Sequence, residues 1–317
     1  MAGVLAVYPK WNEAAGEVCT LAMQVNDCRE NKMGAEKYGY TSDQMAAMEA
    51  MLSVQSRGLP VNVAIDGPAA ATWEQGKELY YYTNVMSCGT NTAASLPCMF
   101  SAMGKAAFEA ADAPAEGLLD VLQRAGLAVL WIDNQSGCKG ACARVPTVET
   151  RGAAHPELCE GGECFDMVML DGIDQRIAEL PQAQRERGVV LVMHQMGSHG
   201  PAYYKRSPAA QKDFVPECTS NALQSCDHQE LVNAYDNSIR YTDHFVAQTI
   251  AWLKTKTSSD TALWYVSDHG ESLGESGLYL HGLPYSFAPI EQKHVPQVTW
   301  LSPAFKQRAR LDTACLK

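Results

Sequence analysis

Three apolar runs along the chain each lead into polar residues that can carry chemistry. The runs contain the letters GLAVLWID, GVVLVMH and TALWYVSD, within residues 126–133, 188–200 and 261–272. They are short, nearly unbroken and rich in β-branched or aromatic residues, which is typical of strands buried on both faces of a parallel sheet. We therefore predict three such strands.

Helical patterns separate these runs. Residues 118–125 (LLDVLQRA) predict a short helix before the first strand, and a long amphipathic helix is expected before the third. Its apolar stripe recurs every three or four positions and comprises Leu231, Tyr235, Ile239, Thr242, Val246, Ile250 and Leu253. Alternating strands and helices indicate an α/β fold, with a mostly parallel central sheet and helices on both faces. Ligands of such sheets bind at the carboxyl ends of the strands, where all three polar clusters lie.

The first 78 residues have a weaker pattern. Residues 44–54 are rich in Met and Ala and predict a helix, and residues 61–65 (VNVAI) predict a strand. Asp66, Gly67 and Pro68 form the expected turn after it. No internal repeat or low-complexity linker is visible.

Charge and hydropathy exclude several classes of protein. The chain has 317 residues, of which 46% are hydrophobic and 19% charged, with a formal net charge of -11. This charge argues against a nucleic-acid binder. Basic residues for a local anion site are Lys139, Arg144, Lys205 and Arg206. The sequence contains no run of about 18 apolar residues, so no transmembrane helix is predicted. The opening MAGVLAVYPKW is too short and too polar for a signal peptide.

Cysteine spacing points to an oxidising compartment. Eight of the 11 cysteines form four close pairs, Cys88 with Cys98, Cys138 with Cys142, Cys159 with Cys164, and Cys218 with Cys226. Such pairs in polar, Gly-rich loops predict disulfides. The alternative, a zinc ribbon, requires C-x2-C spacing, which none of the pairs has. Cys19, Cys28 and Cys315 remain outside the pairs.

The third run ends in a candidate metal site. Asp268 and His269 follow the strand directly, in SDHGES, and both are ligand types that suit zinc. An isolated Asp-His pair is more often a helix cap beside an incidental histidine. Two further histidines, His281 and His199, are expected at the same sheet edge. Three histidines and one aspartate together favour a metal site. Gly270 is expected to let the backbone pass close to the ion.

The second run ends in two histidines around a Gly-containing turn. His199 lies deeper in the loop of HQMGSHGP and is expected to face the site. His194 still belongs to the apolar run, so we interpret it as a hydrogen-bonded core histidine.

Two further segments carry candidate groups. In SCGTNTAASLPC, Thr90 or Thr92 would begin a helix, where its hydroxyl is either a nucleophile facing the positive end of the helix dipole or simply the N-cap. In DNQSGCKGAC, Lys139 stands in a five-residue disulfide ring. It suits a phosphate-bearing substrate, or it is a solvated loop lysine.

These motifs, in this order, resemble the phosphoethanolamine–lipid A transferases, which include the mobile colistin-resistance enzymes. The resemblance covers residues 80–303, about seventy per cent of the chain. It rests on Tyr82-Thr83-Asn84-Val85, SCGTNT with the following PCMF, DNQSGCKG, HQMGSHGPAYYKR, NAYDNS, and SDHGESLGE with YLHG. Six ordered motifs at similar spacing are far more specific than any one of them.

The resemblance implies an alkaline phosphatase/sulfatase fold and a zinc enzyme. By this resemblance, Thr92 matches the family's nucleophile. Thr92, Asp268 and His269 match the ligands of one zinc ion, and a site with two zinc ions is the alternative. Residues matching phosphoryl or second-metal ligands are Lys139, Asn134, His199 and His281. The implied reaction transfers phosphoethanolamine from phosphatidylethanolamine to a lipid A phosphate through a phospho-threonine, giving polymyxin resistance. The implied localisation of the enzyme is the membrane surface, at the periplasmic face of the inner membrane. No nucleic-acid partner is expected.

The chain also departs from this family. Its members carry Gly-Glu-Thr-Ala-Arg at the end of the first strand, with the glutamate as a zinc ligand. Here the corresponding residues 54–57 read Val-Gln-Ser-Arg, and Glu49 and Asp66 are the nearest acidic residues. We therefore expect a divergent segment at 1–78, without the family's transmembrane region, and a C-terminally shortened catalytic domain at 79–317. Gln135 also replaces a more usual asparagine.

Three alternatives remain at this stage. The first is another sulfatase, phosphodiesterase or phosphoglycerol transferase of the same superfamily, although CGTNT differs from the C-x-P-x-R pattern of sulfatases. The second is an inactive, truncated relative, favoured by the missing glutamate motif. The third is a binding or scaffolding module, which no sequence feature favours.

Overall fold

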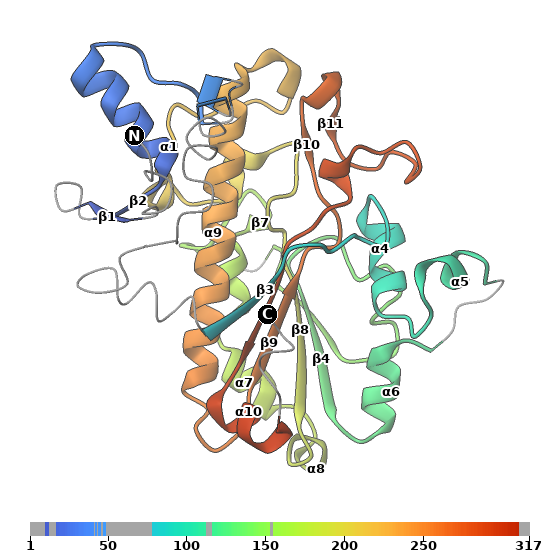
Figure 1. Ribbon diagram of the computed structural model, residues 1–317. Helices are drawn as coiled ribbons and strands as arrows, with labels where there is room; N and C mark the ends of the chain where they lie inside the picture. Colours follow the sequence, from blue (N-terminus) through green and yellow to red (C-terminus); the bar gives the residue numbers. More distant parts are fainter. Residues whose placement is uncertain are drawn as a thin grey trace. The chain divides into compact units, whose positions relative to one another are not determined.

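The computed structural model describes residues 10–12, 17–40, 42, 44, 45, 47, 48, 78–111, 116–152 and 155–310. The chain divides into two compact units, Met1–Leu79 and Tyr80–Lys317. Figure 1 shows the elements of both.

The first unit contains a small hairpin and one helix. Strands β1 (Lys10–Asn12) and β2 (Glu17–Cys19) pair antiparallel, and α1 (Leu21–Asp27) continues into one π-helical segment, Cys28–Lys32. Thr20 is the N-cap of helix α1, because its side chain accepts a hydrogen bond from the backbone N–H of Met23. The buried Asn26 side chain exchanges two hydrogen bonds with the backbone of Tyr38, which fixes the following loop against the helix.

Several predictions for this region concern residues outside the described ones. They are the strand over 61–65, the turn at Asp66 and most of the helix over 44–54, as well as Glu49 and the segment 54–57. Cys315 also lies outside the described residues.

The second unit contains two three-stranded sheets. In the first, β4 (Ala128–Asp133) lies between β5 (Thr147–Glu149) and β8 (Val189–His194), and all three are parallel. In the second, β12 (Gln297–Leu301) lies between β3 (Leu79–Tyr82) and β9 (Ala262–Val266), and β12 is antiparallel to β9. The predicted α/β class is confirmed. Of the two three-stranded sheets, one is parallel, and in the other β12 and β9 are antiparallel.

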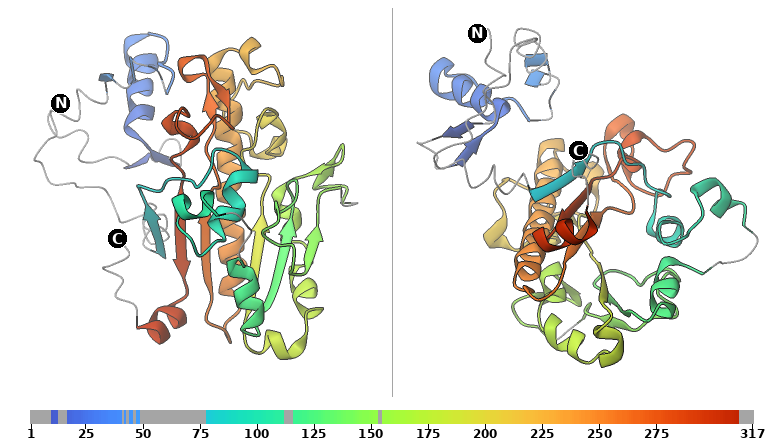
Figure 2. Two further views of the ribbon diagram at one scale, coloured as in Figure 1. Left: turned by 90° about the vertical axis from the view of Figure 1, so that its right-hand side faces the viewer. Right: turned by 60° about the horizontal axis from the view of Figure 1, so that its bottom comes forward.

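Helices cover both faces of the β4 sheet. Alternate residues of β4 point to opposite faces. Ala128, Leu130 and Ile132 pack against the 3-10 segment Asp166–Met169, α7 (Ile173–Ala178) and α9 (His228–Lys254). Val129 and Trp131 pack against α4 (Thr92–Met99) and α6 (Leu118–Arg124). Figures 1 and 2 show these helices on the two sides of the sheet.

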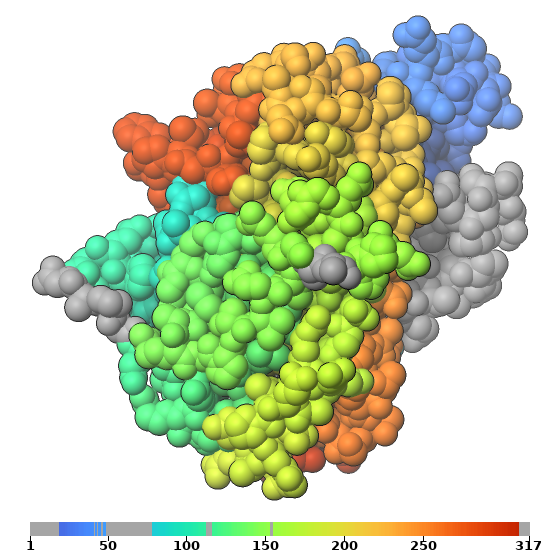
Figure 3. Space-filling view, turned by 180° about the vertical axis from the view of Figure 1, so that it is seen from behind, coloured from blue at the N-terminus to red at the C-terminus, as the bar shows by residue number. Residues whose placement is uncertain are grey.

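Shorter elements complete this unit. They are α5 (Lys105–Glu109), α8 (Gln182–Arg185), α10 (Pro303–Ala309) and the hairpins β6 (Cys159–Glu160) with β7 (Glu163–Cys164) and β10 (Ser272–Leu273) with β11 (Tyr279–Leu280). Seen from behind, the segments coloured green to yellow-green form a large, continuous part of the surface (Figure 3). No described helix is long and apolar enough to cross a bilayer.

The predicted helices are confirmed as α6 and α9, but the buried face of α9 differs from the predicted stripe. Of that stripe, Leu231 and Thr242 are buried, whereas 43% of Ile239 is exposed. The buried positions include polar and small residues, Asn233, Ala234, Asn237, Ser238 and Thr249, which an apolar pattern does not reveal.

The three predicted strands are present as β4, β8 and β9, but only β4 is buried along its whole length. The prediction that all three are buried on both faces is therefore wrong for β8 and β9, whose residues are half-buried or exposed. Among the described strands, each of these two has a neighbour on one side only.

All four predicted disulfides are present, at Cys88–Cys98, Cys138–Cys142, Cys159–Cys164 and Cys218–Cys226. The first links the loop before α4 to that helix, and the third closes the β6–β7 hairpin. Cys28 is exposed and outside these pairs.

Candidate functional site

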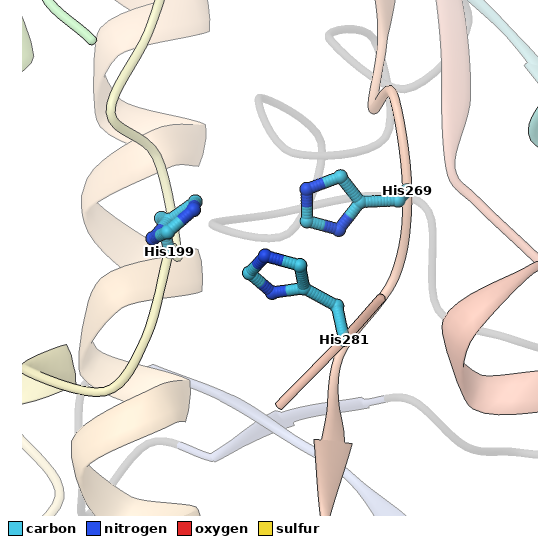
Figure 4. A group of neighbouring side chains, drawn as sticks. All are labelled: His199, His269 and His281. Carbon is cyan, nitrogen blue, oxygen red and sulfur yellow. The ribbon is translucent and has the colours of Figure 1, made fainter. Parts of the chain in front are cut away.

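Three histidines from separate segments converge at the carboxyl ends of β8 and β9. His199 follows β8, His269 follows β9, and His281 follows the β10–β11 hairpin that turns the chain back. One possible ligand atom from each lies within 4.8 Å of the others, and Figure 4 shows the three rings turned toward one another. The sequence prediction that these residues meet at one sheet edge agrees with this arrangement.

The hydrogen bonds of these rings leave the same nitrogen available on each. Nδ1 lies 2.7 Å from the Gly200 carbonyl in His199, 3.0 Å from the Gly270 carbonyl in His269, and 2.9 Å from Oε1 of Glu271 in His281. Because carbonyl and carboxylate oxygens accept, each Nδ1 donates, and in the neutral form of each ring Nε2 carries the lone pair. Metal-binding histidines are typically held in this way.

Thr92 brings a hydroxyl to this cluster. It is the first residue of α4, it is buried, and its Oγ1 lies 3.4 Å from Nε2 of His269. The helix is capped by Asn91, whose side chain accepts from the Ala94 N–H, so the interpretation of either threonine as the N-cap is wrong. Thr90 instead donates to the Leu283 carbonyl at 2.6 Å and its carbonyl accepts from Gly282, which anchors the loop after His281.

Asp268 supplies an unpaired carboxylate oxygen. Its Oδ2 is buried, lies 3.8 Å from Nε2 of His269 and has no hydrogen-bond partner among the described residues. The Ser95 hydroxyl donates to the Asp268 carbonyl, which ties α4 to the end of β9. A buried carboxylate oxygen without a donor is costly. Together with three imidazole nitrogens it is a donor set that suits zinc.

Glu271 joins three parts of the site. Its carboxylate accepts from the Gly200 N–H at 3.2 Å and the Tyr203 hydroxyl at 3.1 Å, and it pairs with His281. Burial alone would raise the pKa of Glu271, but the His281 contact lowers it overall. The motif SDHGES contains Glu271 but does not assign it a role; its place two positions after His269 is the local signal that could have done so.

The electrostatic surroundings of His199 and His281 differ. Burial, followed by the charge of His281, lowers the pKa of His199. Burial also lowers the pKa of His281, but the hydrogen bond and charge of Glu271 outweigh it and raise the pKa overall. His199 is therefore favoured in its neutral form, as a metal ligand must be.

A second network holds the loop that carries His199. The buried Asp166 accepts from the backbone N–H groups of Met196 and Gly197 and from Asn134. Burial raises the pKa of Asp166 despite these donors. The Arg206 guanidinium donates to the His199 carbonyl at 2.9 Å.

Other predicted residues lie outside the histidine cluster. Asn134 is buried and its amide bonds to Asp166 and the Cys164 carbonyl. Lys139 is exposed, and its ammonium bonds to the carbonyl and hydroxyl of Ser136. Their matches to phosphoryl or second-metal ligands remain predictions. Arg144 pairs with Asp120.

Asp133 and His194 form a separate buried pair. Nδ1 of His194 lies 2.9 Å from Oδ2 of Asp133, which also accepts from the Trp131 indole N–H at 2.8 Å. Burial would raise the pKa of Asp133, but these two hydrogen bonds hold it at about 2. The interpretation of His194 as a hydrogen-bonded core histidine agrees with this arrangement.

Gly270 is required by the neighbouring backbone. A Cβ at this position would lie 1.9 Å from the Glu291 carbonyl oxygen. The Gly270 N–H also donates to the Gln292 carbonyl at 3.2 Å. The close approach between two loops therefore explains this glycine, and its role beside an ion stays a prediction.

Comparison with known families accounts for most of the chain. The sulfatase family model matches residues 42–314. The chain belongs to the sulfatase family. Within this family it resembles the phosphoethanolamine transferases, as the ordered motifs indicated, so the predicted superfamily is confirmed.

Two relatives define this similarity. The chain is 48% identical to phosphoethanolamine transferase EptA of Salmonella typhimurium over 242 residues, which cover 76% of this chain and 43% of the relative. The crystal structure of the soluble domain of lipooligosaccharide phosphoethanolamine transferase A from Neisseria meningitidis superposes with a TM-score of 0.71 at 40% identity. That match covers 78% of this chain and 72% of the other. The chain thus spans less than half the length of the full transferase.

The N-terminal part of this sulfatase-family chain resembles a different protein. Residues 1–61 match the SoxA/TsdA cytochrome c domain model. Over 81 residues the chain is 52% identical to the L-cysteine S-thiosulfotransferase subunit SoxA of Rhodovulum sulfidophilum, covering 26% of this chain and 28% of the relative. This similarity gives a reason for the missing transferase pattern that the sequence alone did not supply.

Proposed function

We propose that the second unit is the catalytic domain of a zinc-dependent phosphoethanolamine transferase acting on lipid A. The observation that carries this proposal is the Thr92 hydroxyl beside His269, in a chain whose relatives are phosphoethanolamine transferases. Donor and acceptor are phosphatidylethanolamine and a lipid A phosphate.

The proposed reaction has two displacements at one phosphorus. The Thr92 oxygen attacks the phosphodiester of phosphatidylethanolamine, the bond from phosphorus to the glycerol oxygen breaks, and diacylglycerol leaves with a proton. The lipid A phosphate then attacks the phospho-threonine. The bond from phosphorus to the Thr92 oxygen breaks, phosphoethanolamine passes to lipid A, and the hydroxyl regains a proton.

The residues present fit one zinc ion. Asp268, His269 and Thr92 would hold it, and His199 and His281 would bind the phosphoryl group or a second zinc. When bound, the metal supplies positive charge beside the hydroxyl and the phosphoryl oxygens. The Asp268 oxygen, which has no partner among the described residues, and the three neighbouring imidazoles support this assignment.

The chain itself positions the nucleophile. Thr92 stands at the first turn of α4, where the helix dipole favours negative charge on its oxygen. Ser95 holds the end of β9 against the same helix, and Glu271 fixes the direction of His281. These contacts keep hydroxyl and imidazoles in one geometry before a substrate arrives.

The proposed site of action is a membrane surface at the periplasmic face of the inner membrane. A relative, lipooligosaccharide phosphoethanolamine transferase A from Neisseria meningitidis, is described as an integral membrane protein and is 41% identical over 78% of this chain. The four disulfides support an oxidising compartment.

A lipid assay tests this function. The oxidised protein, loaded with zinc, is incubated with vesicles containing a fluorescent phosphatidylethanolamine and lipid A. We expect labelled diacylglycerol and modified lipid A from the wild type, and neither from Thr92→Val, which keeps the shape of the side chain. Equal product from both proteins would exclude Thr92 as the nucleophile.

Among the described strands, β8 and β9 each have a neighbour on one side only, which favours a second candidate, a relative that folds without catalysing transfer. This candidate predicts a folded, zinc-binding protein that releases no diacylglycerol. The same assay, with zinc content measured on the same sample, separates the two. A soluble sulfate ester, added as a further substrate, tests the remaining alternative of a sulfatase.

A further inference from the structure

The loop that follows His281 carries the most exposed large apolar side chain among the described residues. Phe287 is 81% exposed, and Ile290, three positions later, is 49% exposed. Figure 1 shows this loop, drawn in orange-red after β11, extending outward from the sheets. Isolated apolar residues on a surface are common, so the groups around these two side chains determine what the loop can bind.

Two lysine side chains converge on the tyrosine of the same loop. Nζ of Lys105 lies 3.7 Å from the centroid of the Tyr285 ring, and Nζ of Lys293 lies 5.4 Å from it. Lys105 forms an ion pair with Glu109 at 2.7 Å. Among the described residues, the ammonium of Lys293 bonds to the Tyr285 carbonyl and has no carboxylate partner. The loop therefore combines exposed apolar side chains with a cation that is available to an anion, although the whole chain has a net charge of -11.

Hydrogen bonds tie this loop to the segment that leads into α4. The Thr90 hydroxyl donates to the Leu283 carbonyl at 2.6 Å, and the Tyr285 hydroxyl donates to the Ser87 carbonyl at 3.0 Å. The Ser87 N–H in turn donates to the Lys293 carbonyl at 2.7 Å. The exposed part of the loop is thus held at both ends against the segment that carries the proposed nucleophile.

We propose that residues 284–293, the anchor loop, bind the surface of a bilayer that contains anionic lipid. Phe287 and Ile290 would enter the boundary between headgroups and acyl chains, and Lys293 and Lys105 would contact lipid phosphates. This inference rests on the proposed function, because it takes the substrates to be membrane lipids. The phosphodiester of such a lipid lies in the headgroup layer, so an anchor tied to the nucleophile segment would bring the hydroxyl to the depth of its substrate.

The charge of the anchor loop favours an anionic lipid surface over a second copy of the chain. Within residues 282–294, Glu291 is the only acidic residue, and Lys293 with the neighbouring Lys105 supplies the opposite charge. In a symmetric dimer formed through this loop, the same lysines of two chains would come close together, and like charges repel. Anionic lipids instead complement the lysines, while the acyl region takes up the apolar side chains.

Vesicle binding of the full chain tests the proposal. The probe is a vesicle of phosphatidylcholine and phosphatidylglycerol, which contains no phosphatidylethanolamine, so that binding is measured without reaction by co-sedimentation. The test variants are Phe287→Asp and Lys293→Gln. Val215→Asp is the matched control, because Val215 is 68% exposed, lies between β8 and α9, and receives the same charge.

We expect saturable binding of the wild type, and the same binding of Val215→Asp. Phe287→Asp should bind at least about tenfold more weakly, because a phenyl ring no longer leaves water. Lys293→Gln should weaken binding about fivefold, and this loss should disappear on vesicles of phosphatidylcholine alone, since they offer no net negative charge.

A tryptophan at the same position gives a measurement that does not depend on a weakened variant. Phe287→Trp should bind vesicles like the wild type, and its additional fluorescence should be quenched by lipids brominated on the acyl chain. Val215→Trp should show no such additional quenching. Both are compared with the wild type, which contains six tryptophans of its own.

Several outcomes would overturn the proposal. They are no vesicle binding by the wild type, equal binding losses in Phe287→Asp and Val215→Asp, or an additional fluorescence of Phe287→Trp that brominated lipids do not quench. A dimer that Phe287→Asp dissociates, in a chain that does not bind vesicles, would assign the loop to a second copy.

Diacylglycerol release separates this inference from the proposed function. On a short-chain phosphatidylethanolamine below its critical micelle concentration, Phe287→Asp should be as active as the wild type, whereas on vesicles its activity should fall with its binding. A chain that binds vesicles through the loop but releases no diacylglycerol would refute the proposed function alone. An active chain whose vesicle binding ignores Phe287 would refute this inference alone.

Discussion

The hydroxyl oxygen of Thr92 lies 3.4 Å from Nε2 of His269, although the two residues are 177 positions apart in the sequence. The contact joins the first residue of α4 to the segment that leaves β9. Thr90, two residues earlier, is bonded to the Leu283 carbonyl instead. The structure therefore places the hydroxyl of Thr92, and not that of Thr90, beside the histidine cluster.

Zinc binding should depend on Asp268. Asp268→Asn keeps the size of the side chain but removes the charge of the unpaired oxygen, and loss of a direct ligand should weaken zinc binding by about 100-fold or more. We expect nearly one zinc per wild-type chain after dialysis and little in the variant, measured by elemental analysis.

The metal-free protein provides the control for this variant. The buried oxygen of Asp268 has no donor among the described residues. Asp268→Asn should therefore leave the stability of the metal-free protein unchanged or raise it by at most about 1–3 kcal/mol, which the thermal midpoint reports. A variant that unfolds without zinc would show that Asp268 stabilises the fold and is not primarily a ligand.

Glu271 should matter for both stability and metal binding. Glu271→Ala leaves His281, Tyr203 and the Gly200 N–H without their partner, and we expect a loss of about 3–5 kcal/mol. Glu271→Gln keeps an acceptor and should lose about 1–3 kcal/mol, with zinc affinity reduced about 10–100-fold. Thermal unfolding and zinc titration measure the two effects, and an Ala variant as stable as the Gln variant would argue against this network.

Asp133 should make the protein sensitive to acid. Its pKa of about 2 in the folded state lies below the ordinary 3.8, so its ionised form stabilises the fold above about pH 4. This contribution disappears as pH falls from about 4 to 2. It amounts to about 2 kcal/mol at pH 7.

Asp133→Asn tests this contribution by thermal unfolding between pH 2 and 7. The variant should be less stable than the wild type at pH 7, and the difference should shrink to near zero by pH 2. A difference that stays constant over the whole range would assign the effect to packing around Trp131 and His194 and not to the charge.

Sequence alone was sufficient for the elements that bring the site together. Continuous apolar runs predicted β4, β8 and β9, because buried strands need apolar residues on both faces. Their carboxyl-terminal residues placed His199 and Asp268 at one edge, and close cysteine spacing predicted the four disulfides. These predictions rest on local patterns, which one sequence contains in full.

Features that depend on distant neighbours could not be predicted in this way. The exposure of Val189 and Trp264 follows from a strand edge without a described partner, which no local pattern reveals. Gly270 is needed because the Glu291 backbone passes close by. The contacts of Glu271 come from residues about 70 positions earlier and 10 later. The cap of α4 at Asn91 was missed because three adjacent polar residues could all have taken that position.

The most direct test of the account is to look for phosphoethanolamine on Thr92. The zinc-loaded protein is incubated with phosphatidylethanolamine without lipid A, quenched in acid and mapped by peptide mass spectrometry. The account predicts one phosphoethanolamine group on the peptide that contains Thr92, located at that residue by fragmentation and lost when lipid A is added before quenching. A group on Thr90 or elsewhere, or transfer to lipid A with no modified Thr92 in rapidly quenched samples, would contradict it.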